Sequence, residues 1–535
     1  MKKNNEVLVE NGNKKGGRAV KTVAVMMGAT VIAKLLGMLR GVLQANAYGT
    51  TEAANAFTAA SKLPLTFFDM FLAAAVLGCF IPVYNSFKEK DADGEASREA
   101  DDFACIFLNF IVLLCGVLAL VGIVFAEPFI RLITNGLAES TVTLAVSLTR
   151  IMFPMVIFTG AAYTLVGVLQ SKGSFIAPAL ISAISNAGVV IYLAFFNSSL
   201  GEKGIYGLAV AYLLSWFLQL VTLIIPLIRR GFRYRPILDF RNPALIRAIK
   251  MTPPIMIGSW LAPAGTLLGQ YFAAGVTASG GISGATTVFD YANNVYIIIA
   301  GILTYSICNY TFPKIARLAS GDSAEELAAT VGSSLTSALF ITVPFMTAAL
   351  VLSGEGVAVL YMHGEFTADD ARNTAYTLRF ILSAMPFFCV TELLSRMFYA
   401  KNMPRIPMLA ALGGIAANLT AGVLLTSFGN IGIGAVGLAN AIGQAVAALI
   451  LVLFAIRYVN GLFNKSLVIQ IIKIIIGGGI TLVSCAVMSE LVKSDPYTAG
   501  LLTNTVKALV IFVPSAGLYL IFGKLSRVRF FYNNK

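Results

Sequence analysis

The segment FPMVIFTGAAYTLVGVLQSKGSFIAP at residues 153–178 resembles MPFFCVTELLSRMFYAKNMPRIP at residues 385–407. Likewise, GIYGLAVA at 204–211 resembles GAVGLANA at 434–441, and CFIPVY at 79–84 resembles YTFPKI. The matching positions keep offsets of 229 to 232 residues: Pro82 and Pro313, Pro154 and Pro386, Pro178 and Pro407, Gly204 and Gly434. This regular spacing predicts an internal duplication, in which two similar halves follow one another along the chain.

The composition of the chain is that of a polytopic membrane protein. Of its 535 residues, 57% are hydrophobic and only 12% are charged, whereas about 25% of the residues of a soluble protein are charged. The first 20 residues, MKKNNEVLVENGNKKGGRAV, are polar and basic, and no short apolar core with a cleavage site follows them. We therefore expect a cytoplasmic tail that leads directly into the first span.

The apolar segments between charges, Gly/Pro clusters and polar breaks predict the membrane spans. About 20 apolar residues cross a bilayer as a helix, and polar backbone cannot face lipid. Fourteen segments satisfy these conditions: 23–48, 55–86, 103–126, 141–170, 177–197, 204–228, 251–275, 284–312, 327–353, 371–400, 406–428, 433–456, 467–492 and 500–523. The predicted fold is therefore all-α.

The distribution of Lys and Arg predicts the orientation of these spans. With the N-terminus inside, 27 of the 39 Lys and Arg residues fall in inner segments and four in outer ones. Short cytoplasmic flanks are enriched in positive charge, so we expect both termini in the cytoplasm. The same bias explains the net charge of +13, and no nucleic-acid partner is expected.

Each copy of the duplication contains six predicted spans. Because six is even, both copies have the same orientation and are related by an axis along the membrane normal. The predicted divisions are a cytoplasmic tail (1–22), an N-terminal six-helix lobe (23–228), a basic cytoplasmic linker (229–250), a C-terminal six-helix lobe (251–457), and two extra helices with a C-terminal tail (458–535). Two bundled repeats are typical of transporters, although a scaffold has the same organisation.

Two cations of the first predicted span are candidate functional residues. Lys34 lies roughly 17 Å along the helix at about 1.5 Å per residue, near the membrane midplane. A charge at that depth costs a few kcal/mol on insertion scales, and a scaffold gains nothing obvious from this cost. Arg40 lies nearer the outer surface, where its side chain can reach the interface. It shares a helix face with Gly37 and Gln44.

Further charged and polar residues within spans complete the candidate set. Lys62 and Asp69 are seven residues apart and nearly eclipsed on the second span, while Asp290 and Asn294 lie on the eighth. The acids have two interpretations that remain open: contact with substrate, or neutralisation of the cations of the first span. Lys507, near the outer end of the last span, is expected at the membrane interface.

The sequence contains no pattern typical of covalent catalysis. It has no P-loop, no nucleotide fingerprint and no Ser/His/Asp set. The six cysteines fall singly in apolar segments, which indicates packing rather than metal binding. We expect no enzyme activity, no cofactor and no metal. A transporter of this kind uses an ion gradient, the membrane potential or the gradient of its own substrate.

The segment AKLLGMLRGVLQANAYGTTEAANAFTAASKLP, followed by FIPVYNSFKEK, resembles the N-terminal signature of the MurJ (MviN) family of lipid II flippases. This family belongs to the MOP exporter superfamily. NYTFPKIARLASGD and LYMHGEFTADDARNTAYTL resemble later segments of the same family. The resemblance covers most of the chain, and it implies fourteen helices in two lobes around a V-shaped central cavity that opens alternately to either side.

The resemblance also implies roles for individual residues. The family's cationic cavity receives the diphosphate and sugar of an undecaprenyl-linked peptidoglycan precursor; Arg40 matches a cavity arginine, and Lys34 occupies the place of another. Phe68, Asp69 and Ala73 stand where the family usually has an arginine pair and a glutamate, and Asn294 stands in place of an arginine. No carboxylate in helices 7, 11 or 12 supports sodium coupling.

The main functional hypothesis is a flippase that carries lipid II to the outer leaflet by alternating access, in cell-wall synthesis and the maintenance of cell shape. The substrate-binding residues would be Lys34, Arg40, Lys62, Asp69, Asp290 and Asn294, with the lipid tail near the last two helices. The alternatives are a flippase for another undecaprenyl-diphosphate-linked oligosaccharide, or a MATE-like drug/cation antiporter. The expected partners are this glycolipid and membrane lipids, and the protein is expected to be a monomer.

Overall fold

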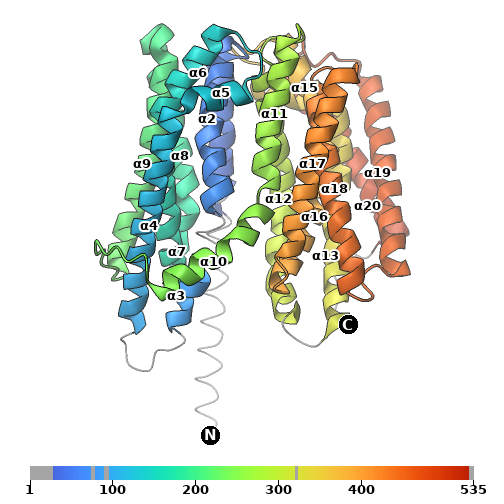
Figure 1. Ribbon diagram of the computed structural model, residues 1–535. Coiled ribbons are helices and arrows are strands. Elements are labelled where there is room, and N and C mark those ends of the chain that lie inside the picture. Colours follow the sequence, from blue (N-terminus) through green and yellow to red (C-terminus); the bar gives the residue numbers. More distant parts are fainter. Residues whose placement is uncertain (1–27, 30, 74–78, 89–95, 320–322, 529–535) are drawn as a thin grey trace, which may run out of the picture. The chain divides into compact units, whose positions relative to one another are not determined.

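The computed structural model describes residues 28–29, 31–73, 79–88, 96–319 and 323–528 (Figure 1). The predicted tail, 1–22, lies outside these residues, as do parts of the predicted spans 23–48 and 55–86. The described residues contain helices and no strand. The chain therefore has the predicted all-α class.

A helix over residues 31–48 begins the described bundle. The following elements are α2 (Glu52–Phe68), the π-helix η1 (Asp69–Ala73), α3 (Ile81–Lys88), α4 (Ala96–Val124), α5 (Ala126–Ile133), α6 (Glu139–Met152), α7 (Met155–Ser171), α8 (Ile176–Phe195), the 3₁₀ segment η3 (Asn197–Lys203) and α9 (Gly204–Arg229). The second half contains α10 (Pro243–Gly258), α11 (Leu261–Ala278), α12 (Ala285–Ala319), α13 (Ala324–Val351), α14 (Ser353–Tyr361), α15 (Ala368–Leu382), α16 (Met385–Ala400), α17 (Arg405–Phe428), α18 (Gly434–Tyr458), α19 (Lys465–Val492) and α20 (Leu501–Leu525).

Ten helical stretches among the described residues are long and apolar enough to cross a membrane, or eleven if α15 and α16 form one bent span. These eleven correspond to eleven of the fourteen predicted spans. The other three predictions fall where the helices are interrupted or the described residues end. For example, 251–275 contains α10 and α11, which are separated at Ser259–Trp260. The protein is thus a multi-pass membrane protein, and fourteen spans remain compatible with the structure.

Two helix breaks lie at positions that match between the two copies of the duplication. A turn at residues 153–154 separates α6 from α7, and a turn at 383–384 separates α15 from α16 with a bend of 45°. Pro154 and Pro386, which match in the duplication, lie at these breaks. Proline has no N–H to donate and clashes with the preceding turn. The two halves of the sequence therefore have the same local interruption at equivalent positions.

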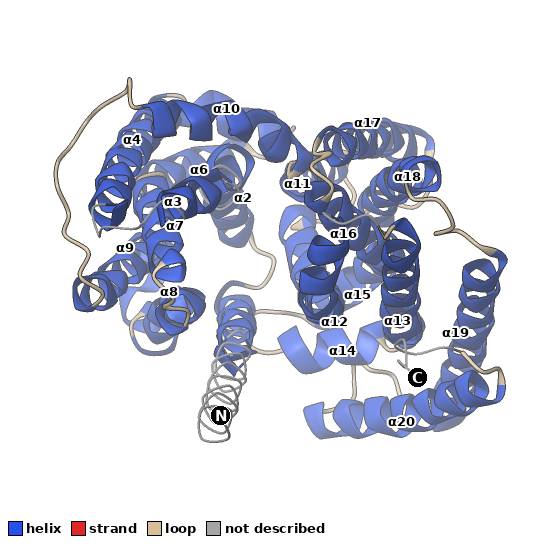
Figure 2. Cartoon of the chain, turned by 90° about the horizontal axis from the view of Figure 1, so that it is seen from below, coloured by secondary structure: helices blue, strands red, loops and turns tan. Residues whose placement is uncertain are grey.

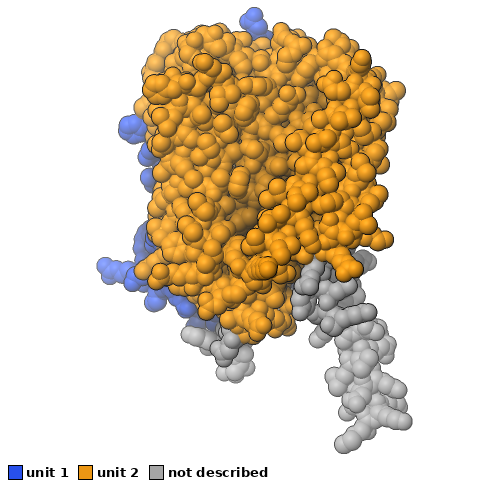
Figure 3. Space-filling view, turned by 90° about the vertical axis from the view of Figure 1, so that its right-hand side faces the viewer, with its two compact units in different colours: residues 1–44, 71–126, 147–253 blue, residues 45–70, 127–146, 254–535 orange. Residues whose placement is uncertain are grey.

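The described chain forms two compact units, each built from separate stretches. Unit 1 comprises residues 1–44, 71–126 and 147–253, and unit 2 comprises 45–70, 127–146 and 254–535 (Figure 3). The element α2 thus packs with the helices of the second half of the sequence. The predicted lobe boundaries, which follow the duplication alone, stay a prediction.

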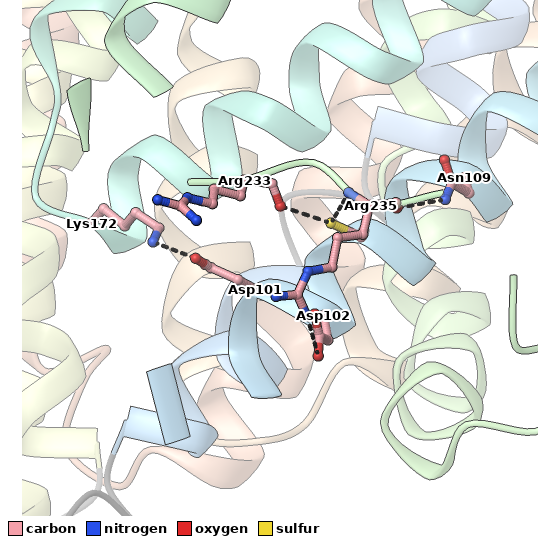
Figure 4. Close-up of polar contacts among 7 residues, drawn as sticks. Asp101, Asp102, Asn109, Lys172, Arg233 and Arg235 are labelled. Atoms are coloured by element: carbon pink, nitrogen blue, oxygen red, sulfur yellow. Dashed lines mark hydrogen bonds and ion pairs between the residues drawn. The ribbon is translucent and has the colours of Figure 1, made fainter. Parts of the chain in front are cut away.

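Unit 1 is built around α4, α7, α8 and α9, and its linker is held along α4. Asp101, Cys105 and Asn109 follow one another at single-turn spacing on α4. Figure 4 shows Asp101 and Asn109 beside the linker. The Asn109 amide donates to the carbonyls of Arg235 (3.4 Å) and Ile237 (2.8 Å). The backbone N–H of Arg235 contacts the Cys105 sulfur at 3.3 Å. We call this extended segment, residues 232–240, the strap.

Ion pairs anchor the same region. Arg235 pairs with Asp102 at 2.9 Å, and Lys172 pairs with Asp101 at 2.9 Å (Figure 4). Part of the predicted basic linker is therefore a fixed segment of unit 1.

In unit 2, α13, α16 and α18 lie side by side around a buried apolar cluster that includes Val331, Leu394, Phe398 and Leu451 (Figure 2). Glycines allow α17 and α18 to approach closely, since a Cβ on Gly414 would lie 2.8 Å from the Gly443 carbonyl oxygen. Small residues at such contacts are typical of membrane helices. Lys507 is buried in unit 2 and paired with Glu355 of α14. Its expected position at the membrane interface stays a prediction.

Candidate substrate-binding residues

Arg40 has a defined position in unit 1. Its Nη1 donates to Asn186 Oδ1 at 2.9 Å, and its guanidinium lies 5.4 Å from the centre of the Tyr212 ring. Asn186 in turn donates to the carbonyl of Ala33 at 3.2 Å. A Cβ on Gly37 would approach the Asn186 amide to 3.2 Å, so the glycine makes room for it. Arg40 is therefore oriented by α8 and α9.

Lys34 lies on the same helix, residues 31–48, and is half-buried. Within the described part of unit 1, no carboxylate pairs with Lys34 or Arg40. A cation without a counter-ion in a membrane-spanning segment is costly, and it is available for an anionic ligand. For unit 1, the structure gives no support to the alternative that acids neutralise these two cations.

Lys62, Asp290 and Asn294 come together in unit 2. Lys62 Nζ lies 2.7 Å from Asp290 Oδ1, and the side chains are 22% and 10% exposed. Asn294 Nδ2 donates to the other oxygen of Asp290 at 3.1 Å. The pair joins α2 to α12. Asp290 therefore neutralises Lys62 of the second predicted span. One interpretation of the sequence pairs the acids with Lys34 and Arg40 of the first span instead.

Asp69 lies close to this pair, at the start of η1. It follows Lys62 by seven residues, and both line a cavity of about 290 Å³ in unit 2. A short π-helix widens the local turn, and such segments occur often at functional sites. No hydrogen bond or ion pair of the Asp69 carboxylate occurs among the described residues. Its charge therefore faces the cavity without compensation.

Other polar residues of this cavity were not among the sequence candidates. Tyr296 and Tyr305 of α12, and Asn440 and Gln444 of α18, also line it. The sequence could have indicated Asn440 and Gln444, because an amide side chain inside an apolar span costs free energy to bury. This indication is weak, since a buried amide is as often part of helix packing as of a binding site. The cavity lining thus adds neutral polar groups to Lys62 and Asp69, and Lys62 is its one cation among the described residues.

Early and late segments of the chain contact one another within unit 2. Asn55 Oδ1 accepts hydrogen bonds from the hydroxyls of Thr286 and Thr287, both at 2.7 Å. Thr50 donates to Asp370 at 2.6 Å. Gly364 and Asn46 pack so closely that a Cβ on the glycine would lie 2.4 Å from the Asn46 carbonyl oxygen. We call these contacts the seal.

An apolar groove of about 550 Å³ lies elsewhere in unit 2, between α13, α16 and α19. Its lining includes Val343, Met346, Pro386, Ile471 and Leu482. Gly478 and Gly479 of α19 also line it. The groove offers almost no hydrogen-bonding group and suits an aliphatic chain. It involves α19, the first of the two extra helices.

Taken by unit, the described site residues offer two different kinds of chemistry. Unit 1 presents two uncompensated cations, which suit an anionic group. Unit 2 presents an ion-paired lysine, a free carboxylate and several amide and phenol groups around a cavity. This arrangement can bind and release a ligand, and it has no nucleophile activated by a base of the kind that covalent catalysis requires.

Comparisons with known proteins agree with this description. The sequence model of a family described as "Lipid II flippase MurJ" matches residues 44–504. A protein of Bdellovibrio bacteriovorus, described as "Probable lipid II flippase MurJ", is 25% identical over 518 residues, which are 96% of this chain and 97% of that one. A Rhizobium meliloti protein of the same description is 27% identical and covers 81% and 79% of the two chains.

Solved structures share the fold. The structure of lipid II flippase MurJ in an inward closed conformation matches with a TM-score of 0.75 and 22% identity, over 94% of this chain and 98% of that one. An inward-facing multidrug resistance MATE family transporter of the MOP superfamily matches with a TM-score of 0.66 and 16% identity, over 83% and 99%. At these identities the likeness concerns the fold alone.

Proposed function

Because the chain belongs to the MurJ family of lipid II flippases, we propose that it carries lipid II across the membrane by alternating access and is a transporter rather than an enzyme. The observation that carries this proposal is the family match over residues 44–504. Multi-pass helices and the MOP transporter fold support it. Moving a charged headgroup through a bilayer without such a protein is costly.

Lys34 and Arg40 are the residues that we propose to bind the diphosphate. They have no carboxylate partner within the described part of unit 1, and Asn186 orients the guanidinium. Arg presents a planar fork that matches phosphate oxygens, while Lys acts as a point charge. We also propose that Lys62, Asp69, Asp290 and Asn294 contact the headgroup, and that the apolar groove beside α19 holds part of the lipid tail.

The proposed cellular setting follows from the charge distribution. The inner segments of the predicted topology carry most Lys and Arg residues, which supports cytoplasmic termini. The family match supports the plasma membrane of a bacterium as the location. With this orientation the seal lies at the outer end of unit 2. It must open before a substrate can leave toward the outer leaflet. We propose that one protein chain carries out this cycle as a monomer.

Reconstitution into vesicles with fluorescent lipid II tests the proposal. The wild type should expose the label to an external reagent, whereas a Lys34→Ala/Arg40→Ala double variant should slow this exposure by about tenfold or more, since each charged hydrogen bond contributes about 1.5–3 kcal/mol. Arg150→Ala, which removes an exposed cation of unit 1, is the matched control. Wild-type flipping by the double variant would contradict the role of the two cations.

A second candidate is a flippase for another undecaprenyl-diphosphate-linked oligosaccharide. Asn294 in place of the usual arginine favours it, because the residue donates to Asp290 and is not a cation for phosphate. Vesicles that contain lipid II beside other undecaprenyl-diphosphate sugars would separate the two. If one of the other glycolipids becomes exposed faster than lipid II, that glycolipid is the preferred substrate.

A further inference from the structure

Asp69 is the one charged group in the lining of the unit 2 cavity that has no partner among the described residues. It lies near the middle of the predicted span 55–86, on the same helix face as Lys62, Leu65 and Thr66, and all four residues line the cavity. Asp69 is exposed, so an occupant of the cavity can reach its carboxylate. A carboxylate at this depth of a membrane is costly unless a cation or a hydrogen-bond donor meets it.

The other charges at this cavity cancel in pairs. Lys62 Nζ lies 2.7 Å from Asp290 Oδ1. At the margin of the cavity, Arg396 lies 3.6 Å from Glu392. The described part of the cavity therefore keeps one uncompensated negative charge. Because charges interact strongly in a site of low polarity, this charge attracts a cation and repels a phosphate group.

Aromatic rings form one wall of the same cavity. Tyr296, Tyr305 and Phe388 all line it. The centre of the Phe388 ring lies 6.3 Å from that of Tyr296 and 6.0 Å from that of Tyr305, both edge to face. Tyr305 is 36% exposed, so its ring is accessible. The face of an aromatic ring attracts an organic ammonium group, and the Arg396 guanidinium already lies 5.6 Å from the centre of the Tyr305 ring.

The remaining lining supplies a further acceptor and sets the size of the ligand. Asn440 lines the cavity, is partly exposed and makes no hydrogen bond among the described residues. Its amide oxygen can accept one of the three N–H groups of an ammonium. The volume of about 290 Å³ is at the small end for ligand sites, which span roughly 300–1,000 Å³. It suits an amino group with its alkyl chain rather than a complete headgroup.

We propose that the unit 2 cavity binds a free primary amine of the transported headgroup in its protonated form, with Asp69 as the counter-ion. The Asn440 amide oxygen accepts a second N–H, and the rings of Tyr305 and Phe388 lie against the cation and its alkyl chain. The proposal rests on the function proposed above, because the amine belongs to the peptide of the lipid-linked precursor. It narrows the substrate class to precursors whose peptide carries an amine that is not acylated.

Two forms of one lipid test the proposal. Lipid II with a free side-chain amine in its peptide is compared with the same lipid II after N-acetylation of that amine, which removes the positive charge. Native mass spectrometry of the purified full chain measures the affinity for each form. The wild type should bind the acetylated form about tenfold more weakly, because a hydrogen bond between charged groups is lost. Asp69→Asn should bind the two forms about equally.

Matched variants separate the charge of Asp69 from its effect on folding. Asp69→Glu keeps the carboxylate and should keep the preference for the free amine. Asp369→Asn is the control, because Asp369 is an exposed aspartate of unit 2 that pairs with Arg372 and does not line the cavity. Tyr305→Leu should reduce the preference severalfold, whereas Tyr305→Phe should keep it. The proposal is overturned if the wild type binds both forms equally, or if Asp69→Asn prefers the free amine as strongly as Asp369→Asn does.

A small amine tests the other source of an ammonium group. n-Butylamine, which is protonated at neutral pH, should compete with the free-amine form of lipid II in the wild type and not in Asp69→Asn. If n-butylamine binds through Asp69 while acetylation of lipid II changes nothing, the cavity takes a free cation and the proposal for the headgroup amine is overturned.

Vesicle flipping separates this proposal from the transport function. The fluorescent label is placed on a part of the headgroup other than the amine. If the wild type flips lipid II but binds its two forms equally, the amine site is wrong and the function stands. If the wild type binds the free amine through Asp69 but flips neither form, the amine site stands and the transport function is wrong.

Discussion

Lys507 Nζ lies 2.9 Å from Glu355 Oε1, and the two side chains are only 5% and 4% exposed. The ion pair joins α20 to α14. The lysine also donates to the carbonyl of Ser494 at 2.7 Å, at the start of the loop that precedes α20. Two extra helices that fall outside the duplicated sequence are thus fixed to unit 2 by a desolvated pair of charges.

Removal of one partner of this pair should destabilise the protein strongly. Lys507→Met leaves the Glu355 carboxylate buried without a cation, which costs about 3–5 kcal/mol. Lys507→Met combined with Glu355→Leu removes both charges and should recover most of the loss. Thermal or denaturant unfolding of the purified variants measures the difference. Equal stability of Lys507→Met and the wild type would show that the pair is not desolvated.

A carboxylate at position 186 should reduce transport. Asn186 accepts from Arg40 at 2.9 Å, so Asn186→Asp would neutralise the guanidinium with a permanent ion pair. We expect flipping to fall by about tenfold, which corresponds to about 1.4 kcal/mol. Asn186→Leu, which removes the acceptor but leaves the charge free, should have a smaller effect. Rates measured in vesicles should rank wild type, Asn186→Leu and Asn186→Asp; the reverse order of the two variants would contradict the proposed role of Arg40.

A covalent bond across the seal should stop the transport cycle. Thr50 Oγ1 donates to Asp370 at 2.6 Å, so the variant Thr50→Cys/Asp370→Cys should form a disulfide under oxidation. We expect flipping to cease in the oxidised protein and to return after reduction, because alternating access requires this end to open. The two single-cysteine variants are controls, and the six native cysteines are buried. Unchanged flipping by fully oxidised protein would mean that the seal is not a gate.

The strap should become accessible when its acceptor on α4 is lost. Asn109→Leu removes the hydrogen bonds to the Arg235 and Ile237 carbonyls, each worth about 1–3 kcal/mol when left unsatisfied. Trypsin should then cleave after Arg233 or Arg235 several times faster than in the wild type. Tyr234→Phe, which removes only the donor to the Asn109 side chain, should have little effect. If the two variants are cleaved at the same rate, Asn109 does not hold the strap.

Much of the fold was predictable from the sequence because it depends on local properties. Apolar length indicated the ten or eleven candidate spans among the described residues, and Pro154 and Pro386 marked equivalent breaks. The partner of Lys62 was not predictable, since Asp290 is far away in sequence and the pairing depends on α2 packing against α12. The place of Gln444 in the cavity lining was hidden for a similar reason: an amide on one helix becomes part of a cavity only when other helices surround it.

Unit 2 is built from stretches that are synthesised at different times, because residues of unit 1 lie between them in the sequence. Residues 45–70 emerge from the ribosome long before residues 254–535, with which they pack. Lys62 therefore enters the membrane without its counter-ion, and Asp290 reaches it only after most of unit 1 has been made. A nascent chain stopped at Pro253 would keep an unpaired lysine in the bilayer, so the first half of the gene cannot yield a finished product without the second.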